Sequence, residues 1–278
     1  MRILFDVLSG TSILVLLTSG LAIIAGMMRI FNLAHGEFVL LGAIISYAVY
    51  EQGWPLWLGI PLSILGLFVF GVILERTVIR HLYERPMDAI LVTWAIAIMI
   101  RGFVTLGLGG ASGQNVPYPV GGSIDMGGTG ISIWRLIIIG ATILVIALLI
   151  LLIRYTPAGL QVRASLANVE LARLSGIRTG RVFALTFGLG SALAGLTGAL
   201  IVPLASLSPT LGVSYLINSF MSLMVGGLGS IGAATTGAIL IGGADGFLAF
   251  LIGPSFSGAL VLFFAVVLMR FRPNGIFK

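Results

Sequence analysis

The sequence contains no cysteine and only two histidines, His35 and His81. The absence of cysteine excludes disulfides, thiol catalysis and cysteine-ligated metals, although it says little about the cellular compartment. The two histidines lie in separate segments and lack the H-x-x-x-H or H-E-x-x-H spacing of a helical zinc site. The remaining polar residues do not assemble into a nucleophile with a base and an orienting partner. The sequence therefore predicts neither a metal site nor an enzyme.

Charged residues are also scarce, at 9% of the chain, whereas 58% of the residues are hydrophobic. An ordinary soluble domain is roughly 25% charged. We predict an all-α polytopic membrane protein, a single transmembrane domain over residues 1–278, with about eight or nine transmembrane or partly re-entrant helices of about 20 residues or fewer. The apolar runs that could form them are 7–28, 38–50, 55–74, 89–108, 134–153, 182–205, 215–230, 237–253 and 255–269.

The arginines lie mainly in short segments between these runs, at 75–88, 154–181 and 270–278. The positive-inside rule predicts that all three segments, and hence the C-terminus, are cytoplasmic. The connection 109–132 has no lysine or arginine and fits the opposite side. The net charge of +6 therefore indicates topology and not a nucleic-acid partner. The first run is too long for a signal-peptide core and has no cleavage site, so we expect a retained span.

Two segments share a pattern of apolar run, polar or glycine break and short apolar run. One is NLAHGE at 32–37 and the other is the glycine-rich stretch 226–232. Such paired breaks are typical of inverted-repeat transporters, although plain helix packing also explains the glycines. We expect NLAHGE to form a cytoplasmic-side break whose side chains satisfy freed backbone groups, or else an ordinary interfacial turn. The candidate residues of a translocation path are Asn32, His35, Glu37, Gly226 and Gly227.

Two ionisable residues fall inside apolar runs, Arg101 in 89–108 and Asp245 in 237–253. An ionisable group in hydrocarbon is costly unless it faces a partner or a wet cavity, so such residues are functional candidates. We add Asp245 to the candidate path residues, where it could line or brace the path. Arg101 could instead extend its side chain toward the outer interface.

The segment 163–181, RASLANVELARLSGIRTGR, predicts a short helix outside the membrane. We expect it to begin at Ser165 as N-cap and to stop at Gly176. A single apolar stripe would be formed by Ala164, Ala167, Leu171 and Leu174, and Glu170 could pair with Arg173. From spacing alone, the helix could be a solvated amphipathic connector lying on the membrane or against a partner.

The sequence Glu170-Leu171-Ala172, followed after three residues by Gly176, resembles the E-A-A-x-x-x-G loop of ABC importer permeases. In that family the loop is a coupling helix that docks in a cleft of the ATP-hydrolysing subunit. Leu171 replaces the first alanine, and the later I-x-L-P portion is not evident. The resemblance places the coupling loop at 154–181 and implies ATPase coupling by Ser165, Glu170, Leu171, Ala172, Arg173, Leu174 and Gly176.

Four longer stretches are similar to permeases of the branched-chain amino acid ABC importers, a family that includes urea and short-chain amide importers. They are NLAHGEFVLLGA, GIRTGRVFALTFGLGSALAGLTGALI, SFMSLMVGGLGSIGAATTGAIL and RPNGIF, in that order along nearly the whole chain. Two others, LVTW at 91–94 and SPTLGVSYLINSFM at 208–221, look closer to the urea and amide branch.

This resemblance implies a multi-pass permease of the bacterial inner membrane that carries branched-chain amino acids, or alternatively urea or short amides. The implied partners are a homologous permease or a second copy, two ATPase subunits that hold ATP and Mg, an external solute-binding protein and membrane lipid. The chain itself would bind no cofactor. Because its only lysine is Lys278, it has no G-x-x-x-x-G-K-[ST] phosphate loop. An ion-coupled secondary transporter or channel, using Asp245 or Glu37, is the alternative from another class.

Overall fold

The computed structural model describes residues 2–28, 30–107, 113–125, 130–227, 230–272 and 275–276. The elements in chain order are α1 (Arg2–Met28), α2 (His35–Glu51), η1 (Leu56–Leu58), α3 (Gly59–Thr77), η2 (Ile79–Leu82), α4 (Pro86–Gly107), β1 (Ser123–Asp125), β2 (Gly130–Ser132), α5 (Ile133–Tyr155), α6 (Pro157–Ala167), α7 (Val169–Leu174), α8 (Thr179–Ile201), α9 (Leu211–Gly226), α10 (Ile231–Ile252) and α11 (Pro254–Phe271). The two short strands pair in antiparallel fashion, with Ile124 opposite Ile131.

The all-α membrane architecture predicted from the sequence is confirmed. Within the described residues, six helices are long and apolar enough to cross a bilayer: α1, α3, α4, α5, α8 and α10. Two further apolar helices, α9 and α11, are shorter. Where the structure describes the chain, each apolar run of the sequence is mostly helical, and run 38–50 corresponds to α2. The number of crossings stays a prediction.

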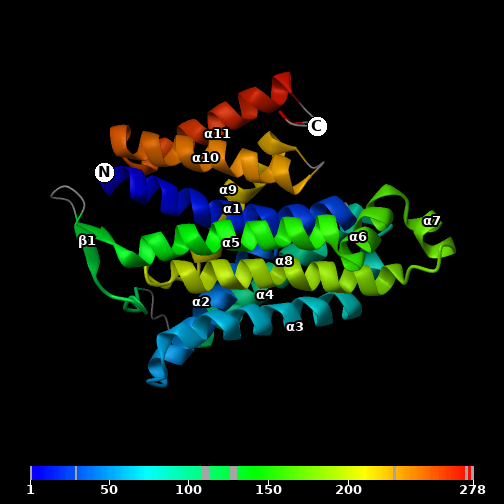
Figure 1. Cartoon of the computed structure of the whole chain (residues 1–278), viewed down its shortest axis with the longest axis horizontal. Coiled ribbons are helices and arrows are strands. Elements are labelled where there is room, and N and C mark those ends of the chain that lie inside the picture. The colour runs from blue at the N-terminus through cyan, green and yellow to red at the C-terminus, as the bar shows by residue number, and fades with distance from the viewer. Residues whose placement is uncertain are drawn as a thin grey trace.

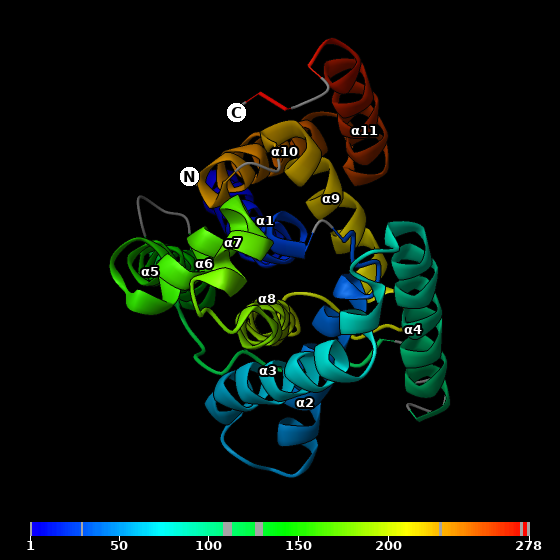
Figure 2. The ribbon, with the colours of Figure 1, turned by 90° about the vertical axis from the view of Figure 1, so that its right-hand side faces the viewer.

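Helix α8 is the centre of the molecule, with α1, α2, α3 and α5 arranged around it (Figure 2). Nearly every side chain of α8 is buried, because small residues let neighbouring backbones approach it closely. A Cβ atom added at Gly198 would collide with the Val39 carbonyl of α2, and one at Gly195 would lie 2.6 Å from the Ser63 carbonyl of α3. The glycines of run 182–205 therefore serve close helix packing.

The NLAHGE break is buried inside the bundle and does not form a solvent-facing turn, whereas its expected position on the cytoplasmic side stays a prediction. His35 is fully buried, and its Nε2 lies 3.3 Å from the carbonyl oxygen of Leu17, a residue inside α1. The Leu33 amide donates to the Thr93 hydroxyl inside α4 (3.2 Å). As predicted, the Asn32 side chain satisfies a backbone group, since its Oδ1 accepts from the Ala34 amide (3.0 Å). Helix α2 thus starts within the fold, buried against protein.

The second half contains a matching feature, although not at the expected place. Helix α9 begins beside the start of α2, where Gly36 and Gly212 are so close that a Cβ on either would collide with the other's carbonyl oxygen. From this point α2 and α9 run toward opposite ends of the molecule (Figure 1). The predicted break at 226–232 is instead a hairpin between α9 and α10, and Leu228 and Gly229 lie outside the described residues. An inverted repeat remains a prediction.

The two ends of the molecule differ in charge and structure (Figure 1). At the arginine-rich end, defined by residues 75–88 and 154–181, α6 and α7 extend beyond the long helices. At the hairpin end, the β1–β2 hairpin and the N-terminus of the chain lie together. Segments 75–88 and 154–181, whose arginines predict the same side of the membrane, therefore lie at the same end of the molecule. The described part of connection 109–132, which has no lysine or arginine, lies at the opposite end.

Candidate functional site

The segment predicted to dock an ATPase folds as two helices, α6 and α7. Thr156 caps α6 by accepting a hydrogen bond from the Gly159 amide (3.0 Å), and Pro157 occupies the first turn. Asn168 caps α7, because its Oδ1 accepts from the amides of Glu170 and Leu171 at 3.0 Å each. The chain therefore turns sharply at Asn168.

This turn corrects the prediction that one helix starts at Ser165. Ser165 lies inside α6 and is buried, so it caps nothing. The extended backbone of Asn168 (φ −160°) separates the two helices and interrupts the predicted apolar stripe. Arg173 does not pair with Glu170, since its Nε donates instead to the Thr179 hydroxyl (3.0 Å).

The predicted stop at Gly176 is confirmed. Gly176 has a φ of +84°, a conformation that suits glycine at the C-terminal end of a helix. The Ile177 amide closes the turn by donating to the Ala172 carbonyl (3.0 Å). This closure leads the chain directly from α7 into α8.

Helix α7 presents an apolar tip away from the protein. The side chains of Leu171 and Leu174 are 61% and 84% exposed, whereas Ala172 is buried and faces the rest of the fold. Exposed leucines on a short charged helix beyond the long helices are suited to a protein partner. The seven residues predicted for coupling therefore divide into an exposed tip, a framework of Ala172, Arg173 and Gly176, and the buried Ser165.

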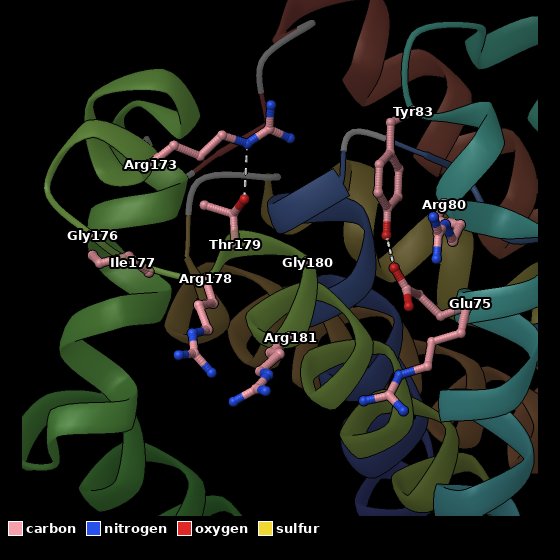
Figure 3. Close-up of a pocket in the computed structure, with 11 residues that line it drawn as sticks. Glu75, Arg80, Tyr83, Arg173, Gly176, Ile177, Arg178, Thr179, Gly180 and Arg181 are labelled. Carbon is pink, nitrogen blue, oxygen red and sulfur yellow. Dashed lines mark hydrogen bonds between the residues drawn. The ribbon is translucent and has the colours of Figure 1, made fainter.

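Beside α7 lies a cavity of about 740 Å³ at the arginine-rich end (Figure 3). The end of α3 with the following turn forms one wall, and the turn from α7 into α8 forms the other. Its lining residues are Glu75, Arg76, Arg80, Tyr83, Arg173, Gly176, Ile177, Arg178, Thr179, Gly180 and Arg181. Two segments far apart in sequence thus build one basic site.

Tyr83 and Glu75 hold the α3 wall of this cavity together. The Tyr83 hydroxyl donates to Glu75 Oε1, and the Tyr83 ring packs edge-on against Phe183 of α8, with centroids 5.1 Å apart. Burial, aided by the Glu75 carboxylate, raises the pKa of Tyr83, so the phenol stays a hydrogen-bond donor. In the sequence, segment 75–88 is notable only for its arginines, and the spacing of Glu75 and Tyr83 does not predict the hydrogen bond between them.

The ionisable candidates inside the helices are in different places. Glu37 is 2% exposed and is paired with Arg101, which is 36% exposed. This pair gives Arg101 a partner inside the fold, and it corrects the expectation for Glu37, whose carboxylate bonds to a side chain and not to a backbone group. The pair and the Thr93–Leu33 hydrogen bond join α4 to the start of α2.

Asp245 lines a second cavity, of about 570 Å³, between α1, α9 and α10. Its carboxylate accepts a hydrogen bond from the Ser257 hydroxyl (2.8 Å), and it forms no ion pair with any described residue. The cavity combines polar and apolar groups: Ile3, Asp6, Val7, Gly10, Leu14, Ser214, Tyr215, Asn218, Gly242, Gly246, Ala249 and Phe250 complete the lining. Asp6 is paired with Arg135 (3.1 Å).

Gly226 and Gly227 are not brought to Asp245. Gly226 packs against Ala233 near the start of α10, and Gly227 has a φ of +107° where the hairpin turns. Twelve residues separate Ala233 from Asp245, which is about 18 Å along a helix. The predicted path residues therefore lie at three sites; Gly226 serves helix packing and Gly227 the turn, and a role of these residues in a path stays a prediction. Among the described residues, no three histidine, aspartate or glutamate side chains group as metal ligands.

Comparison with known proteins gives consistent results over nearly the whole chain. The family described as "Branched-chain amino acid transport system / permease component" matches residues 3–271. The chain is 27% identical to the Pseudomonas aeruginosa protein BraD, a high-affinity branched-chain amino acid transport system permease protein, over 94% of this chain and 90% of that protein. It is 25% identical to Escherichia coli LivH, of the same description and with the same coverage.

More distant similarity extends to a permease named for a sugar. The chain is 25% identical to the ribose import permease protein RbsC of Haemophilus influenzae, over 86% of this chain and 75% of that protein. No solved structure matches the chain.

Proposed function

The chain belongs to the family of branched-chain amino acid transport permease components, and we propose that it is the transmembrane permease of an ATP-driven ABC importer for these amino acids. ATP and Mg are held by two separate ATPase subunits. A homologous permease or a second copy completes the membrane part, and an external solute-binding protein delivers the solute. In this arrangement the arginine-rich end and the C-terminus are cytoplasmic, in a bacterial inner membrane.

The observation that carries the proposal is the position of α7. This helix extends beyond the long helices at the arginine-rich end, with Leu171 and Leu174 exposed, and Gly176 links it closely to the start of α8. Because α8 is the buried centre of the bundle, a push or pull on α7 reaches the helices around it. An ATPase that grips α7 can therefore change the packing of the transmembrane helices.

The solute path is proposed to pass through the Asp245 cavity. A branched-chain amino acid has an ammonium group next to an apolar side chain. The cavity offers a carboxylate without a paired cation next to apolar groups of α1 and α10. The low charge of the rest of the cavity wall keeps binding weak enough for release. Glu37, being paired with Arg101, is less suited to carry a coupling ion.

The coupling role is tested by reconstituting the permease with its ATPases and solute-binding protein in proteoliposomes. Glu170→Arg places the wrong charge on α7, and Gly176→Pro cannot adopt the positive φ of the turn. Both variants should lower ATP-driven uptake by about tenfold or more, because a few hydrogen bonds or contacts at the partner surface are lost. Binding-protein stimulation of ATP hydrolysis should fall in parallel, while membrane insertion stays normal.

Matched controls separate coupling from general disturbance of this end. Glu84→Arg makes the same charge change on the exposed turn before α4, and Gly140→Ala adds a methyl group in α5 where no atom lies within 4 Å. Both controls should transport normally. Unchanged uptake in Glu170→Arg and Gly176→Pro would remove the coupling role from α7. Uptake driven by a pH gradient without ATP would instead favour an ion-coupled secondary transporter.

The solute class is tested in the same vesicles. Labelled leucine, isoleucine and valine should be taken up with their binding protein, and urea, acetamide and ribose should not. Uptake of urea or an amide in place of leucine would assign the chain to the urea and amide branch while leaving the permease role intact.

A further inference from the structure

The cavity beside α7 contains an unusual concentration of unpaired positive charge. We call it the arginine cavity, after its five arginines: Arg76, Arg80, Arg173, Arg178 and Arg181. All five are exposed residues. The one carboxylate in the lining, Glu75, is buried and accepts the hydrogen bond of Tyr83. Among the described residues, none of the five arginines forms an ion pair.

The positive-inside rule explains the end at which these arginines lie, but not their convergence. Other arginines at the same end have partners of their own. Arg85 pairs with Asp88 (3.9 Å), Arg163 donates to the Arg154 carbonyl (3.2 Å), and the Arg154 guanidinium lies 5.7 Å from the centre of the Tyr155 ring. By contrast, the five come from segments about a hundred residues apart and line one cavity (Figure 3). Such a basic concavity attracts anions.

The position of the cavity indicates which anion it receives. Arg173 and Gly176 belong both to the cavity lining and to the α7 segment, whose exposed leucines suit a protein partner. A protein that covers the tip of α7 therefore also lies over the arginine cavity. Arginine guanidinium groups bind carboxylates through paired, charge-assisted hydrogen bonds.

We propose that the arginine cavity receives an acidic segment of the ATPase subunit, as a second and electrostatic anchor beside the apolar tip of α7. This proposal depends on the proposed function, because it requires an ATPase partner. Aspartate or glutamate side chains of that segment neutralise Arg178, Arg181 and Arg76. The anchor fixes the orientation of the ATPase on α7 and makes assembly faster and dependent on salt.

The test measures the affinity of the purified ATPase for full-length permease in nanodiscs made of neutral phosphatidylcholine, from 50 to 500 mM NaCl. The wild-type affinity should fall steeply with salt. The variant Arg178→Glu/Arg181→Glu should bind about 10- to 100-fold more weakly at 50 mM NaCl, with a much flatter salt dependence. The variant Arg270→Glu/Arg272→Glu is the matched control, because it reverses two exposed charges outside both the cavity and the coupling loop, and it should change affinity less than about threefold.

A second arm identifies the partner side of the contact. Acidic residues of the ATPase are changed to lysine one at a time, and one or more of these changes should restore binding to Arg178→Glu/Arg181→Glu while weakening binding to the wild-type permease. Unfolding midpoints of the permease variants confirm that folding is intact, as expected for changes at exposed positions.

The outcomes separate this proposal from the proposed function. If Glu170→Arg abolishes ATPase binding while reversal of Arg178 and Arg181 changes neither affinity nor its salt dependence, the electrostatic anchor is wrong and the permease role stands. If the wild-type permease binds no ATPase, both are wrong. A third result, in which native mass spectrometry finds phosphatidylglycerol or cardiolipin on the wild type but not on the reversed variant, with equal ATPase affinity, would assign the cavity to lipid and overturn the proposal.

Discussion

Two carboxylates inside the helices, Glu37 and Asp245, have opposite surroundings. Glu37 is buried at the start of α2 and is paired with Arg101 of α4. Asp245 lies along α10 at the wall of a cavity, where the Ser257 hydroxyl is the only group among the described residues that is bonded to it. A buried and paired charge holds helices together, whereas a carboxylate without a cation beside open space is available to a solute. The difference separates a structural position from the position that we propose for transport.

The largest expected effect comes from removing Arg101. Arg101→Leu leaves the Glu37 carboxylate buried without its cation, so we expect a loss of stability of about 2 to 4 kcal/mol. The double variant Glu37→Leu/Arg101→Leu should recover most of it, and Arg85→Leu, which breaks an exposed pair, should cost under about 1 kcal/mol. Thermal unfolding of the purified protein in detergent measures all three. Equal unfolding midpoints for the single and double variants would show that the pair is not what holds α4.

The packing beside each carboxylate gives the next contrast. In Gly36→Ala, next to Glu37, the new methyl group meets the Gly212 carbonyl and the Leu216 Cβ atom, which cannot easily move. We expect a cost of about 2 kcal/mol. In Gly246→Ala, next to Asp245, the methyl group meets the Val7 side chain at 2.9 Å, and about 1 kcal/mol is expected.

Gly243→Ala serves as the control for both, because no atom lies within 4 Å of the new methyl group, and a small gain in helix stability is expected. Unfolding midpoints should rank Gly243→Ala above Gly246→Ala and Gly36→Ala lowest. The reverse order for the last two would mean that the α2–α9 junction is looser than the α1–α10 contact.

Removing Asp245 should affect transport and hardly affect stability. Asp245→Leu should lower leucine uptake about tenfold, which corresponds to about 1.4 kcal/mol, and Asp245→Asn should lie between this variant and the wild type. The unfolding midpoint should change little, since the carboxylate is bonded to one hydroxyl. Uptake in proteoliposomes and thermal unfolding are measured on the same preparations. Normal uptake by Asp245→Leu would make the residue structural and end the contrast with Glu37.

The smallest effect is expected from Ser257→Ala. The Ser257 hydroxyl shares its single proton between Asp245 Oδ1 and the Pro254 carbonyl, so its loss removes at most one orienting hydrogen bond from Asp245 and leaves the charge in place. Uptake should fall about twofold, in line with about 0.5 kcal/mol for one hydrogen bond. A loss as large as that of Asp245→Leu would mean that the serine itself contacts the solute.

The helices could be predicted from the sequence because each apolar run is a continuous stretch of the chain. The stop at Gly176 was predictable for a similar local reason, since glycine favours the positive φ that ends a helix there. The start at Ser165 was not, because Asn168 is an equally good cap and has two amides to bond. Local capping signals compete, and tertiary packing around the buried Ser165 decides between them.

Partners across the fold could not be predicted. The Glu37–Arg101 pair joins residues 64 positions apart, and the depth of the NLAHGE break depends on contacts with Leu17 and Thr93. The arginine cavity likewise forms only when the α3 end meets the α7–α8 turn. A single sequence shows which groups are costly to bury, but not which group lies opposite each of them.

The central claim is that an ATPase grips α7 at the arginine-rich end. A photo-cross-linking amino acid at Leu174, whose side chain is 84% exposed, tests it most directly in membranes that contain the assembled transporter. We predict a cross-link to the ATPase subunit that changes in yield when ATP is added, with no such product from the same probe at Tyr118 near the hairpin end. Cross-links from Leu174 to lipid or to the external solute-binding protein alone would contradict the account.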